Sequence, residues 1–394
     1  MEISYDVAVI GAGASGLVCA RSAAKRNRRV VVIDHNKAPG KKILMSGGGR
    51  CNFTNRRVTA EHFISSNPHF CKSALSRFTP EDFLDWVRGA NIPFEEREFG
   101  RLFCKGKASE ILDLILGDCK GAGVTFMLDA GEIRVSKRSQ GDFSIEMGKK
   151  RINAVSLVVA TGGVSIPGAG ASALGYTIAE NFKIPVVPPR PGLVPFTLDP
   201  KDKDVLAPLS GIAVKARVVL GRAAFTENLL FTHRGLSGPV ILQVSSHWEP
   251  GQAVAIDLLP DVDLLDIFDK AREKGSKKQV KTLLGDYLPK RLVAARISKK
   301  MANKPLCAIP KSQLAPLAAA FHAWMIKPCG TEGYRTAEVT VGGVDCNQIS
   351  SKTMEARKVP GLYFIGEVLD VTGWLGGYNL HWAWASGYCA GQFV

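Results

Sequence analysis

The sequence lacks the usual features of membrane, metal and disulfide proteins. No apolar run approaches the ~18 residues that a membrane-spanning helix needs. The first predicted strand starts almost at the N-terminus, without a basic segment before it, so we expect no signal peptide. The nine cysteines are scattered, and neither a C-x-x-C pair nor a His/Cys cluster with metal-ligand spacing occurs. We therefore expect free thiols, no metal, no membrane partner and a cytoplasmic location.

What the sequence does contain is a glycine motif near its N-terminus. The apolar run 7–10 predicts a buried parallel strand, and Gly11, Gly13 and Gly16 follow it in the spacing G-x-G-x-x-G. A helical stretch and a second apolar strand come next, and that strand ends at Asp34. In this motif the glycines allow a tight turn and close approach of a pyrophosphate, while the helix N-terminus attracts phosphate and the acid binds ribose. We expect the dinucleotide at Gly11, Gly13, Ala14, Ser15, Gly16 and Asp34.

The length of 394 residues suggests two domains. Strand and helix patterns alternate up to residue 190, as in a doubly wound α/β domain, and the proline-rich stretch 185–195 marks a boundary. Within the first part, small residues at Ala160-Thr161-Gly162-Gly163 let the chain pass close to a nucleotide. We predict a nucleotide-binding domain of residues 1–190 plus 336–394 and an insert of residues 191–335, β-rich at 191–260 and 327–335 and helical and basic at 262–326.

Three further segments indicate that the dinucleotide is a flavin. Three consecutive glycines precede Arg50, whose guanidinium can pair with a phosphate or a flavin oxygen. A predicted strand ends in Gly366-Glu367, which places an acceptor beside ribityl hydroxyls. A glycine pair at 376–377 opens the last helix, where N–H groups can stabilise an anionic reduced flavin. The further candidate residues for FAD are Lys42, Ser46, Gly47, Gly48, Gly49, Arg50, Cys51, Asn52, Ala160, Thr161, Gly162, Gly163, Gly366, Glu367, Asp370, Gly376, Gly377, Tyr378 and Asn379.

The positive charge of the chain is concentrated in one segment. The net charge of the chain is +15. Residues 270–304 hold twelve Lys or Arg and only two acids, Glu273 and Asp286, so this segment carries +10, two thirds of the net charge. Such a run can be an ordinary solvated helical surface, or it can bind a polyanion such as RNA. The candidate RNA-binding residues are Lys270, Arg272, Lys274, Lys277, Lys278, Lys281, Lys290, Arg291, Lys299 and Lys300.

The flavin segments together resemble a bacterial family of FAD-dependent oxidoreductases related to glutathione reductase. This family includes BaiN-type bile-acid reductases and RdsA/YhiN-type ribosomal RNA dihydrouridine synthases, and the chain is most similar to the second branch. The resemblance rests on the signatures at 46–55 and 376–379 and extends to 228–239 and 331–340. The family usually has Gln where this chain has His381, so the role of His381 is open and includes a hydrogen bond to the flavin edge.

The resemblance implies a fold, a cofactor and a substrate. The fold is α/β: a Rossmann-like, glutathione-reductase-like FAD-binding domain with an inserted domain made of a small β-barrel and a helical subdomain. FAD is expected to be bound without a covalent link. The implied reaction is reduction of the C5=C6 bond of a uridine in large-subunit ribosomal RNA, with that RNA or a precursor particle as partner.

The source of electrons is also constrained by what the sequence lacks. No second G-x-G-x-x-G follows a predicted strand, so the NAD(P)H domain of disulfide reductases is missing, and so is their reactive cysteine pair. We therefore expect NAD(P)H as a transient reductant that visits the face of the flavin on which the substrate later binds. The preference between NADH and NADPH cannot be read from the sequence.

Two alternatives to RNA modification stay open. The chain could be a small-molecule flavin oxidoreductase of the ene-reductase or amine-oxidase type without an RNA substrate, or a flavin-dependent binding or sensor protein. Reduction of the uridine C5=C6 bond needs a general acid, and Cys51, His233 and Tyr378 are the candidates. Each also has an ordinary interpretation, as a buried thiol, a loop imidazole or a packed phenol. Trp382 and Trp384 are expected in the core.

Overall fold

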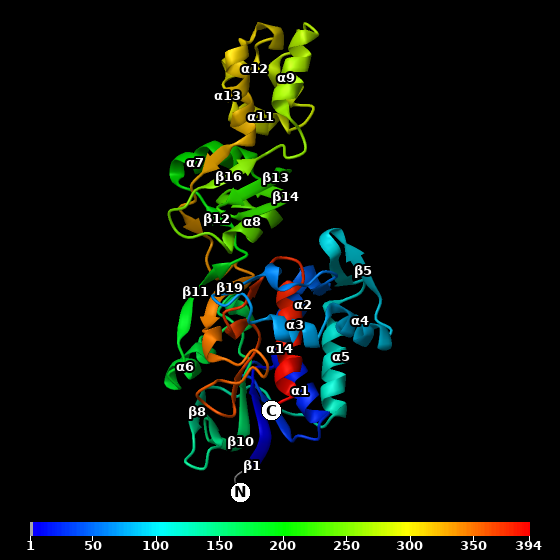
Figure 1. Ribbon diagram of the computed structural model, residues 1–394, viewed down its shortest axis with the longest axis vertical. Coiled ribbons are helices and arrows are strands. Elements are labelled where there is room, and N and C mark those ends of the chain that lie inside the picture. Colours follow the sequence, from blue (N-terminus) through cyan, green and yellow to red (C-terminus); the bar gives the residue numbers. More distant parts are fainter. Residues whose placement is uncertain (1–2) are drawn as a thin grey trace. The chain divides into compact units, whose positions relative to one another are not determined.

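The computed structural model describes residues 3–394 and divides the chain into two compact units (Figure 1). Unit 1 contains the chain up to Arg190 together with Glu338–Val394, and unit 2 is Pro191–Ala337. The sequence predicts a return to the first domain at residue 336, and the observed return comes two residues later. No helix among residues 3–394 is both long and apolar enough to cross a membrane.

A mixed sheet forms the centre of unit 1. Its strands follow the order β7-β2-β1-β10-β9-β8, and β20 pairs with the C-terminal half of β10. The strands are β1 (Ile3–Ile10), β2 (Val30–Ile33), β7 (Thr125–Met127), β8 (Ile133–Lys137), β9 (Phe143–Met147), β10 (Lys150–Val159) and β20 (Leu362–Phe364). The parallel strand β2 is apolar throughout because both of its faces are buried.

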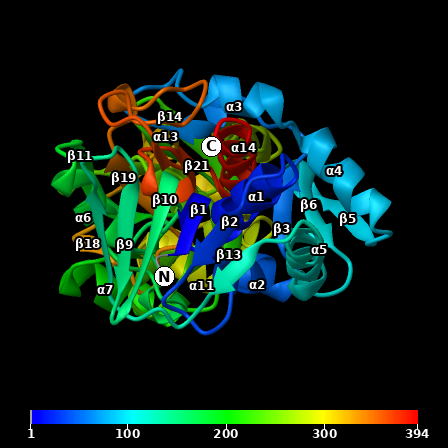
Figure 2. The same ribbon diagram turned by 90° about the horizontal axis from the view of Figure 1, so that it is seen from below.

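Two helices from distant parts of the sequence pack together beside this sheet (Figure 2). They are α1 (Ala14–Ala24) and α14 (Tyr378–Gly391). A Cβ at Gly387 of α14 would lie 2.4 Å from the Ser15 carbonyl oxygen, and a Cβ at Gly391 would lie 2.8 Å from the Cys19 oxygen. The two glycines, one helical turn apart, therefore let the backbones approach closely.

The other elements of unit 1 surround the sheet. The helices are α2 (Lys41–Met45), α3 (Lys72–Arg77), α4 (Pro80–Gly89), α5 (Ala108–Gly121) and α6 (Leu174–Asn181). A three-stranded sheet contains β3 (Asn52–Asn55), β5 (Phe94–Arg97) and β6 (Arg101–Cys104). Two strand pairs complete the unit: β4 (Phe63–Ile64) with β21 (Thr372–Gly373), and β11 (Val186–Gly192) with β19 (Val339–Val344).

Unit 2 begins with a seven-stranded sheet in the order β17-β16-β13-β14-β15-β12-β18. The strands are β12 (Phe196–Thr197), β13 (Ala213–Leu220), β14 (Ala223–Phe231), β15 (Gly235–Ser237), β16 (Val254–Asp257), β17 (Trp324–Ile326) and β18 (Gly330–Thr331). The two edge strands, β17 and β18, are separated by only three residues in the sequence. The sheet must therefore curl like a small barrel to bring its edges together. Two helices accompany it, α7 (Pro200–Leu206) and α8 (Pro239–Ser245).

Five helices form the other part of unit 2. They are α9 (Leu264–Glu273), α10 (Val280–Leu284), α11 (Lys290–Arg296), α12 (Lys299–Ala302) and α13 (Lys311–His322). Phe268, Leu292 and Phe321 are fully buried among them. The helical segment is shorter than the sequence predicts, because residues 324–326 pair with β16 as the strand β17.

Candidate functional site

The glycine motif packs the end of β1 against α1 and β10. Gly11 has a φ of +114°, and a Cβ there would lie 2.2 Å from the Ala160 carbonyl oxygen. A Cβ at Gly16 would lie 2.0 Å from the Gly11 carbonyl oxygen. A larger residue at either position would displace backbone, so both glycines are required by the fold itself.

Gly13 differs from these two glycines because its surroundings are open. A Cβ at Gly13 would meet no atom within 4 Å, and α1 starts after Gly13 without a side-chain cap or an acid in its first turn. The N–H groups of this turn therefore face open space at the positive end of the helix dipole. A pyrophosphate fits this arrangement.

Asp34 is held in place by the chain around it. One carboxylate oxygen accepts the Ala12 N–H at 2.7 Å, and the other accepts the Asn36 N–H at 2.7 Å. The residue is only 8% exposed. Oδ1 also accepts the Asn36 side-chain amide at 3.0 Å, whereas Oδ2 has a second lone pair that can accept a hydrogen bond from a ribose hydroxyl.

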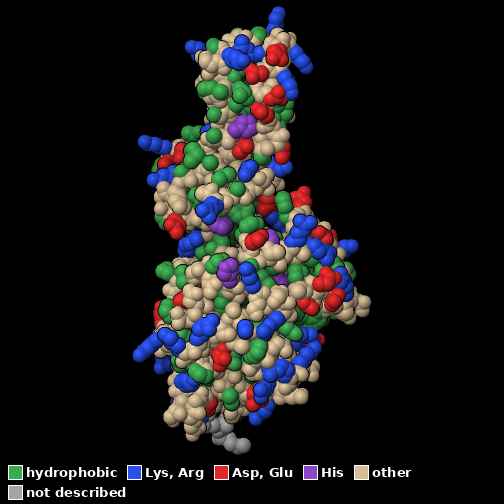
Figure 3. All heavy atoms as spheres, in the orientation of Figure 1, with side chains coloured by type: hydrophobic (Ala, Val, Ile, Leu, Met, Phe, Trp, Pro, Cys, Tyr) green, Lys and Arg blue, Asp and Glu red, His purple; other side chains and the backbone are tan. Residues whose placement is uncertain are grey.

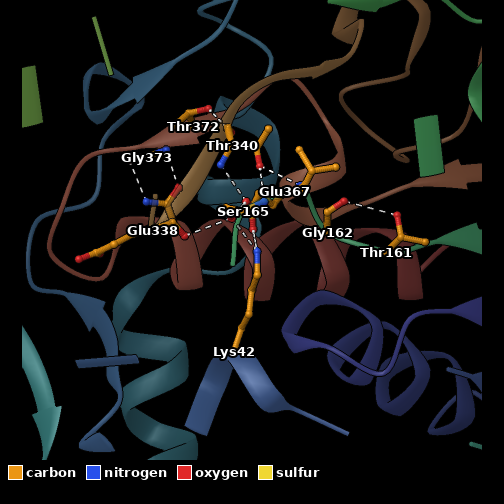
Figure 4. Close-up of polar contacts among 11 residues, drawn as sticks. Lys42, Thr161, Gly162, Ser165, Glu338, Thr340, Glu367, Thr372 and Gly373 are labelled. Carbon is orange, nitrogen blue, oxygen red and sulfur yellow. Dashed lines mark hydrogen bonds and ion pairs between the residues drawn. The ribbon is translucent and has the colours of Figure 1, made fainter. Parts of the chain in front are cut away.

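Lys42 and Glu367 form a partly buried ion pair that joins four segments (Figure 4). Lys42 Nζ lies 2.9 Å from Glu367 Oε2 and 2.9 Å from Ser165 Oγ. Glu367 Oε1 accepts the Ser165 hydroxyl at 3.0 Å and the Thr340 N–H at 2.9 Å. Burial raises the pKa of Glu367, but Lys42, the Thr340 N–H and Ser165 together lower it below its usual value. The carboxylate is therefore charged at neutral pH and directed mainly at the protein.

The segment that follows β10 lies against this ion pair. A Cβ at Gly163 would come within 2.4 Å of Thr340 Oγ1 and 2.7 Å of Glu367 Oε1, whereas a Cβ at Gly162 would meet nothing within 4 Å. Ser165 and Thr340 were missed by the sequence analysis. Nothing in the local pattern marks them, because only the tertiary fold brings these two segments to Glu367.

A rigid loop precedes α14. Gly377 has a φ of +95°, and a Cβ there would lie 2.3 Å from the Thr54 carbonyl oxygen. Asn379 accepts the Gly373 N–H and donates to the Gly373 carbonyl, both at 2.8 Å. With its amide oriented to satisfy its neighbours, Asn52 accepts the Gly377 N–H at 3.0 Å. The helix starts without a side-chain cap, so its first turn can receive an anionic acceptor.

Arg50 and the three glycines before it form an exposed turn. The φ values of Gly48 and Gly49 are +65° and +84°, and a Cβ at either glycine would meet no atom within 4 Å. Ser46 Oγ donates to the Ile43 carbonyl at 2.7 Å, which fixes the start of the turn. The Arg50 guanidinium is exposed, and its acidic neighbour Glu95 is 3.8 Å away. The turn can therefore present both backbone and a cation to a ligand.

Two of the predicted contact residues are turned into the core. The Cys51 side chain is fully buried, and burial raises its thiol pKa to about 12. Asp370 is 3% exposed, and its Oδ2 accepts both the N–H and the hydroxyl of Ser66. This burial argues against Cys51 as a proton donor and against Asp370 as a ligand contact. Both residues instead stabilise the surrounding chain.

The other candidate acids lie in different units. His233 is exposed in unit 2, between β14 and β15. Tyr378 is buried at the start of α14, and its ring stacks on His62 with 4.6 Å between centroids. The sequence analysis missed His62, which is a single histidine in a loop without a motif around it. His62 Nδ1 accepts the Thr59 N–H at 3.1 Å, which places the ring proton on Nε2, and burial lowers its pKa.

His381 belongs to the core rather than to the flavin edge. Its Nδ1 is 2.8 Å from Thr54 Oγ1, and its Nε2 is 3.1 Å from the Phe78 carbonyl oxygen. Burial lowers the pKa of His381 to about 4, so the ring is neutral. Trp382 and Trp384 are also in the core, as the sequence predicts. All nine cysteines are free thiols.

Lys and Arg side chains lie on the surface of the part of unit 2 that contains α9–α13 (Figure 3). Several have partners: Lys270 pairs with Asp266, Lys278 pairs with Asp286, Lys281 donates to Asn303, and Arg291 donates to the Pro208 carbonyl. Arg272 is half-buried. Among the candidate RNA-binding residues, the exposed lysines with no ion pair or side-chain hydrogen bond in residues 3–394 are Lys274, Lys277, Lys290, Lys299 and Lys300.

Comparison with known proteins links these features to a family. A family model described as "HI0933-like protein Rossmann domain" matches residues 5–393. The chain is 49% identical over 391 residues to the ribosomal RNA dihydrouridine synthase of Escherichia coli strain K12, covering 98% of this chain and 97% of the relative. It is 48% identical over 389 residues to the enzyme of that name from Haemophilus influenzae, covering 97% and 96%.

Two more distant similarities complete this comparison. The 3-dehydro-bile acid delta(4,6)-reductase of Clostridium scindens is 29% identical over 405 residues, covering 98% of each chain. Among solved structures, a quinol-fumarate reductase with bound menaquinol superposes with a TM-score of 0.50 and 15% identity, covering 100% of this chain and 71% of that one. At this identity the match is evidence for the fold alone.

Proposed function

The chain belongs to the HI0933-like Rossmann family, and on that basis we propose that it is an FAD-dependent reductase of uridine in large-subunit ribosomal RNA. The observation that carries the proposal is the identity of 48–49% to two ribosomal RNA dihydrouridine synthases over nearly the whole chain. The substrate of those relatives is a polyanion, which agrees with the net charge of +15. The protein then acts in the cytoplasm, where ribosomal RNA is found.

Three features of unit 1 would hold FAD. The first turn of α1 and the open side of Gly13 hold the pyrophosphate, and Asp34 holds the ribose. The uncapped start of α14 would stabilise the anionic edge of the ring system. Bound FAD, reduced by NAD(P)H, supplies the hydride that saturates the C5=C6 bond of uracil.

The remaining task of the protein is to deliver a proton to C5. His62 and Tyr378 are the stacked titratable side chains beside the start of α14. The proton of His62 lies on Nε2, because Nδ1 accepts the Thr59 N–H. We infer that one of these two side chains is the proton donor. The alternative donor is His233, which lies in unit 2.

The RNA backbone is proposed to bind along α9–α13. Lys274, Lys277, Lys290, Lys299 and Lys300 are exposed and unpaired within the described chain, so each can neutralise a phosphate without first breaking an ion pair. Lys270 and Lys278 would have to leave Asp266 and Asp286. We therefore rank the five unpaired lysines first among the RNA contacts.

The test is reduction of ribosomal RNA by the purified protein. Deproteinised large-subunit RNA is incubated with the protein, FAD and either NADH or NADPH, and dihydrouridine is mapped by mass spectrometry. We expect one or a few uridines to be converted, and we expect the same positions to lose dihydrouridine in cells without the protein. If flavin is reduced and reoxidised but no uridine changes in free RNA or in ribosomal particles, the proposal is wrong.

A second candidate function is favoured by one observation. The 29% identity to a bile acid reductase extends over 98% of both chains, and that relative acts on a small molecule. In this alternative, the chain reduces a C=C bond of a small substrate and the basic helices have no substrate role. Steroid enones tested in the same assay, with RNA as the competitor, distinguish the two functions.

A further inference from the structure

The hairpin between β5 and β6 carries an exposed aromatic ring at its tip. Phe99 is 59% exposed and has a φ of +61°, and Gly100 follows it with a φ of +73°. A bulky side chain in the left-handed region is strained, and an exposed phenyl ring forgoes the gain from burial. Phe99 thus combines an unfavourable backbone conformation with an exposed aromatic ring, and this combination points to a role in binding.

The tip of this hairpin is fixed to the loop before α14. The side-chain nitrogen of Asn55 donates to the Phe99 carbonyl and to the Gly376 carbonyl, both at 3.0 Å. Asn55 is 1% exposed, so these bonds are not in competition with water. The Arg56 N–H also donates to the Gly100 carbonyl at 2.7 Å. The backbone of Phe99 is therefore fixed next to the loop for which we propose contact with the flavin edge.

A cation supports the ring from the same loop. The Arg101 guanidinium carbon lies 5.1 Å from the centroid of Phe99, within the range of a cation–π contact. The Arg101 side chain also lies against Gly376, where a Cβ would come within 2.8 Å of its Nε. The ring is thus held from one side and exposed to solvent on the rest of its surface.

We propose that Phe99 is the stacking platform for the nucleobase next to the target uridine. A uridine that reaches a flavin must leave its base stack, and its neighbour then exposes an unstacked face. An exposed, rigid phenyl ring beside the reaction site replaces that lost stacking, which is sequence-tolerant because every base has such a face. The inference rests on the proposed function and adds a specificity for unpaired or flipped-out uridine.

The test compares three variants with the wild type in RNA binding and uridine reduction. Phe99→Ala removes the ring, Phe99→Trp keeps an aromatic face, and Val155→Ala is a control at a residue of unit 1 that is 62% exposed. We expect Phe99→Ala to weaken RNA binding roughly 5- to 150-fold, because one stacked base is lost. Phe99→Trp and Val155→Ala should bind as the wild type does.

The salt dependence separates stacking from phosphate contacts. Loss of a stacked base lowers RNA affinity equally at every salt concentration, so the slope of log affinity against log salt should stay unchanged in Phe99→Ala. Unchanged affinity and KM for RNA in Phe99→Ala, or equal damage in Phe99→Trp, would overturn the inference while uridine reduction by the wild type stands. A wild type that reduces no uridine would overturn the proposed function and this inference together.

FAD content and the melting temperature are measured for every variant. Phe99 is largely exposed, so both should be preserved in Phe99→Ala. If Phe99→Ala loses FAD, the ring supports the loop before α14 rather than the RNA, and the inference is wrong.

Discussion

Asparagine side chains replace regular secondary structure around the start of α14. Asn52, Asn55 and Asn379 all bond backbone groups of the loop 373–377. Buried peptide groups need partners, and beyond the short β21–β4 pairing and the Trp374 N–H, which donates to the His62 carbonyl, this loop finds them in side chains. These bonds fix the backbone of the loop, so the entropic cost of binding is lowered for the flavin that we propose it contacts.

The motif glycines give a first prediction at this scale. Gly13→Val should leave the fold intact, because no atom lies within 4 Å of the added Cβ, but should fill the space proposed for the pyrophosphate. Gly16→Ala, the matched change, should lower the free energy of unfolding by about 3 kcal/mol through its clash with the Gly11 carbonyl. Urea unfolding and the flavin absorbance of the purified variants measure both effects. A yellow Gly13→Val protein would contradict the placement of FAD.

His381 gives a prediction about pH. Burial lowers its pKa to about 4 from the usual 6.5, so between these values the unfolded chain binds more protons than the folded chain. Stability from this group is complete above pH 6.5 and falls as the pH drops toward 4. Between pH 7 and pH 5 the loss is about 2 kcal/mol. His381→Gln should remove this part of the pH dependence in urea unfolding at both pH values, and identical pH dependence in the two proteins would show that His381 is not its source.

At the scale of elements, the lysine pair on α12 gives a prediction about RNA binding. Lys299 and Lys300 are exposed on α12, and Lys149 and Lys150 are an equally exposed pair in the hairpin between β9 and β10. Reversal of the first pair to Glu should lower RNA affinity and reduce the slope of log affinity against log salt by ~1.4–1.8, or ~0.7–0.9 for each lost phosphate contact. Reversal of the second pair is the control for net charge and should have little effect on the slope. Equal effects of both reversals would assign RNA binding to total charge alone.

The sequence predicts the elements of the nucleotide fold well because their signal is local. The run 7–10, the motif glycines and Asp34 lie within thirty residues, and some of their contacts are with one another, such as the Ala12 N–H to Asp34. The partners of Glu367 could not be predicted, since Ser165 is 202 residues away and its hydroxyl has no motif. Cys51 and Asp370 also have chemically suitable side chains, but both are buried in the core, which the sequence does not indicate. Periodicity does not show on which side of a turn a short side chain will lie.

At the scale of the whole molecule, every proposed FAD residue belongs to unit 1 and every proposed phosphate contact belongs to unit 2. The two boundaries are close in space, because the first lies within β11 and the second immediately precedes β19, which pairs with β11. Replacement of residues 191–337 by a short Gly/Ser linker should therefore give a folded protein that binds FAD and has lost its affinity for RNA. Flavin absorbance, circular dichroism and RNA titration measure the outcome. A folded but colourless product would mean that FAD also needs residues of unit 2.

The packing of α14 on α1 has a consequence for the order in which the protein matures. The ribosome makes α1 and most strands of the central sheet first, then the whole of unit 2, and only then residues 338–394. Unit 2 can fold as soon as it emerges, but the apolar side of α1 stays uncovered until α14 has left the exit tunnel. A nascent chain arrested before residue 378 would thus carry a folded unit 2, for which we propose RNA binding, and an incomplete unit 1, and we expect FAD to bind only after α14 has covered α1.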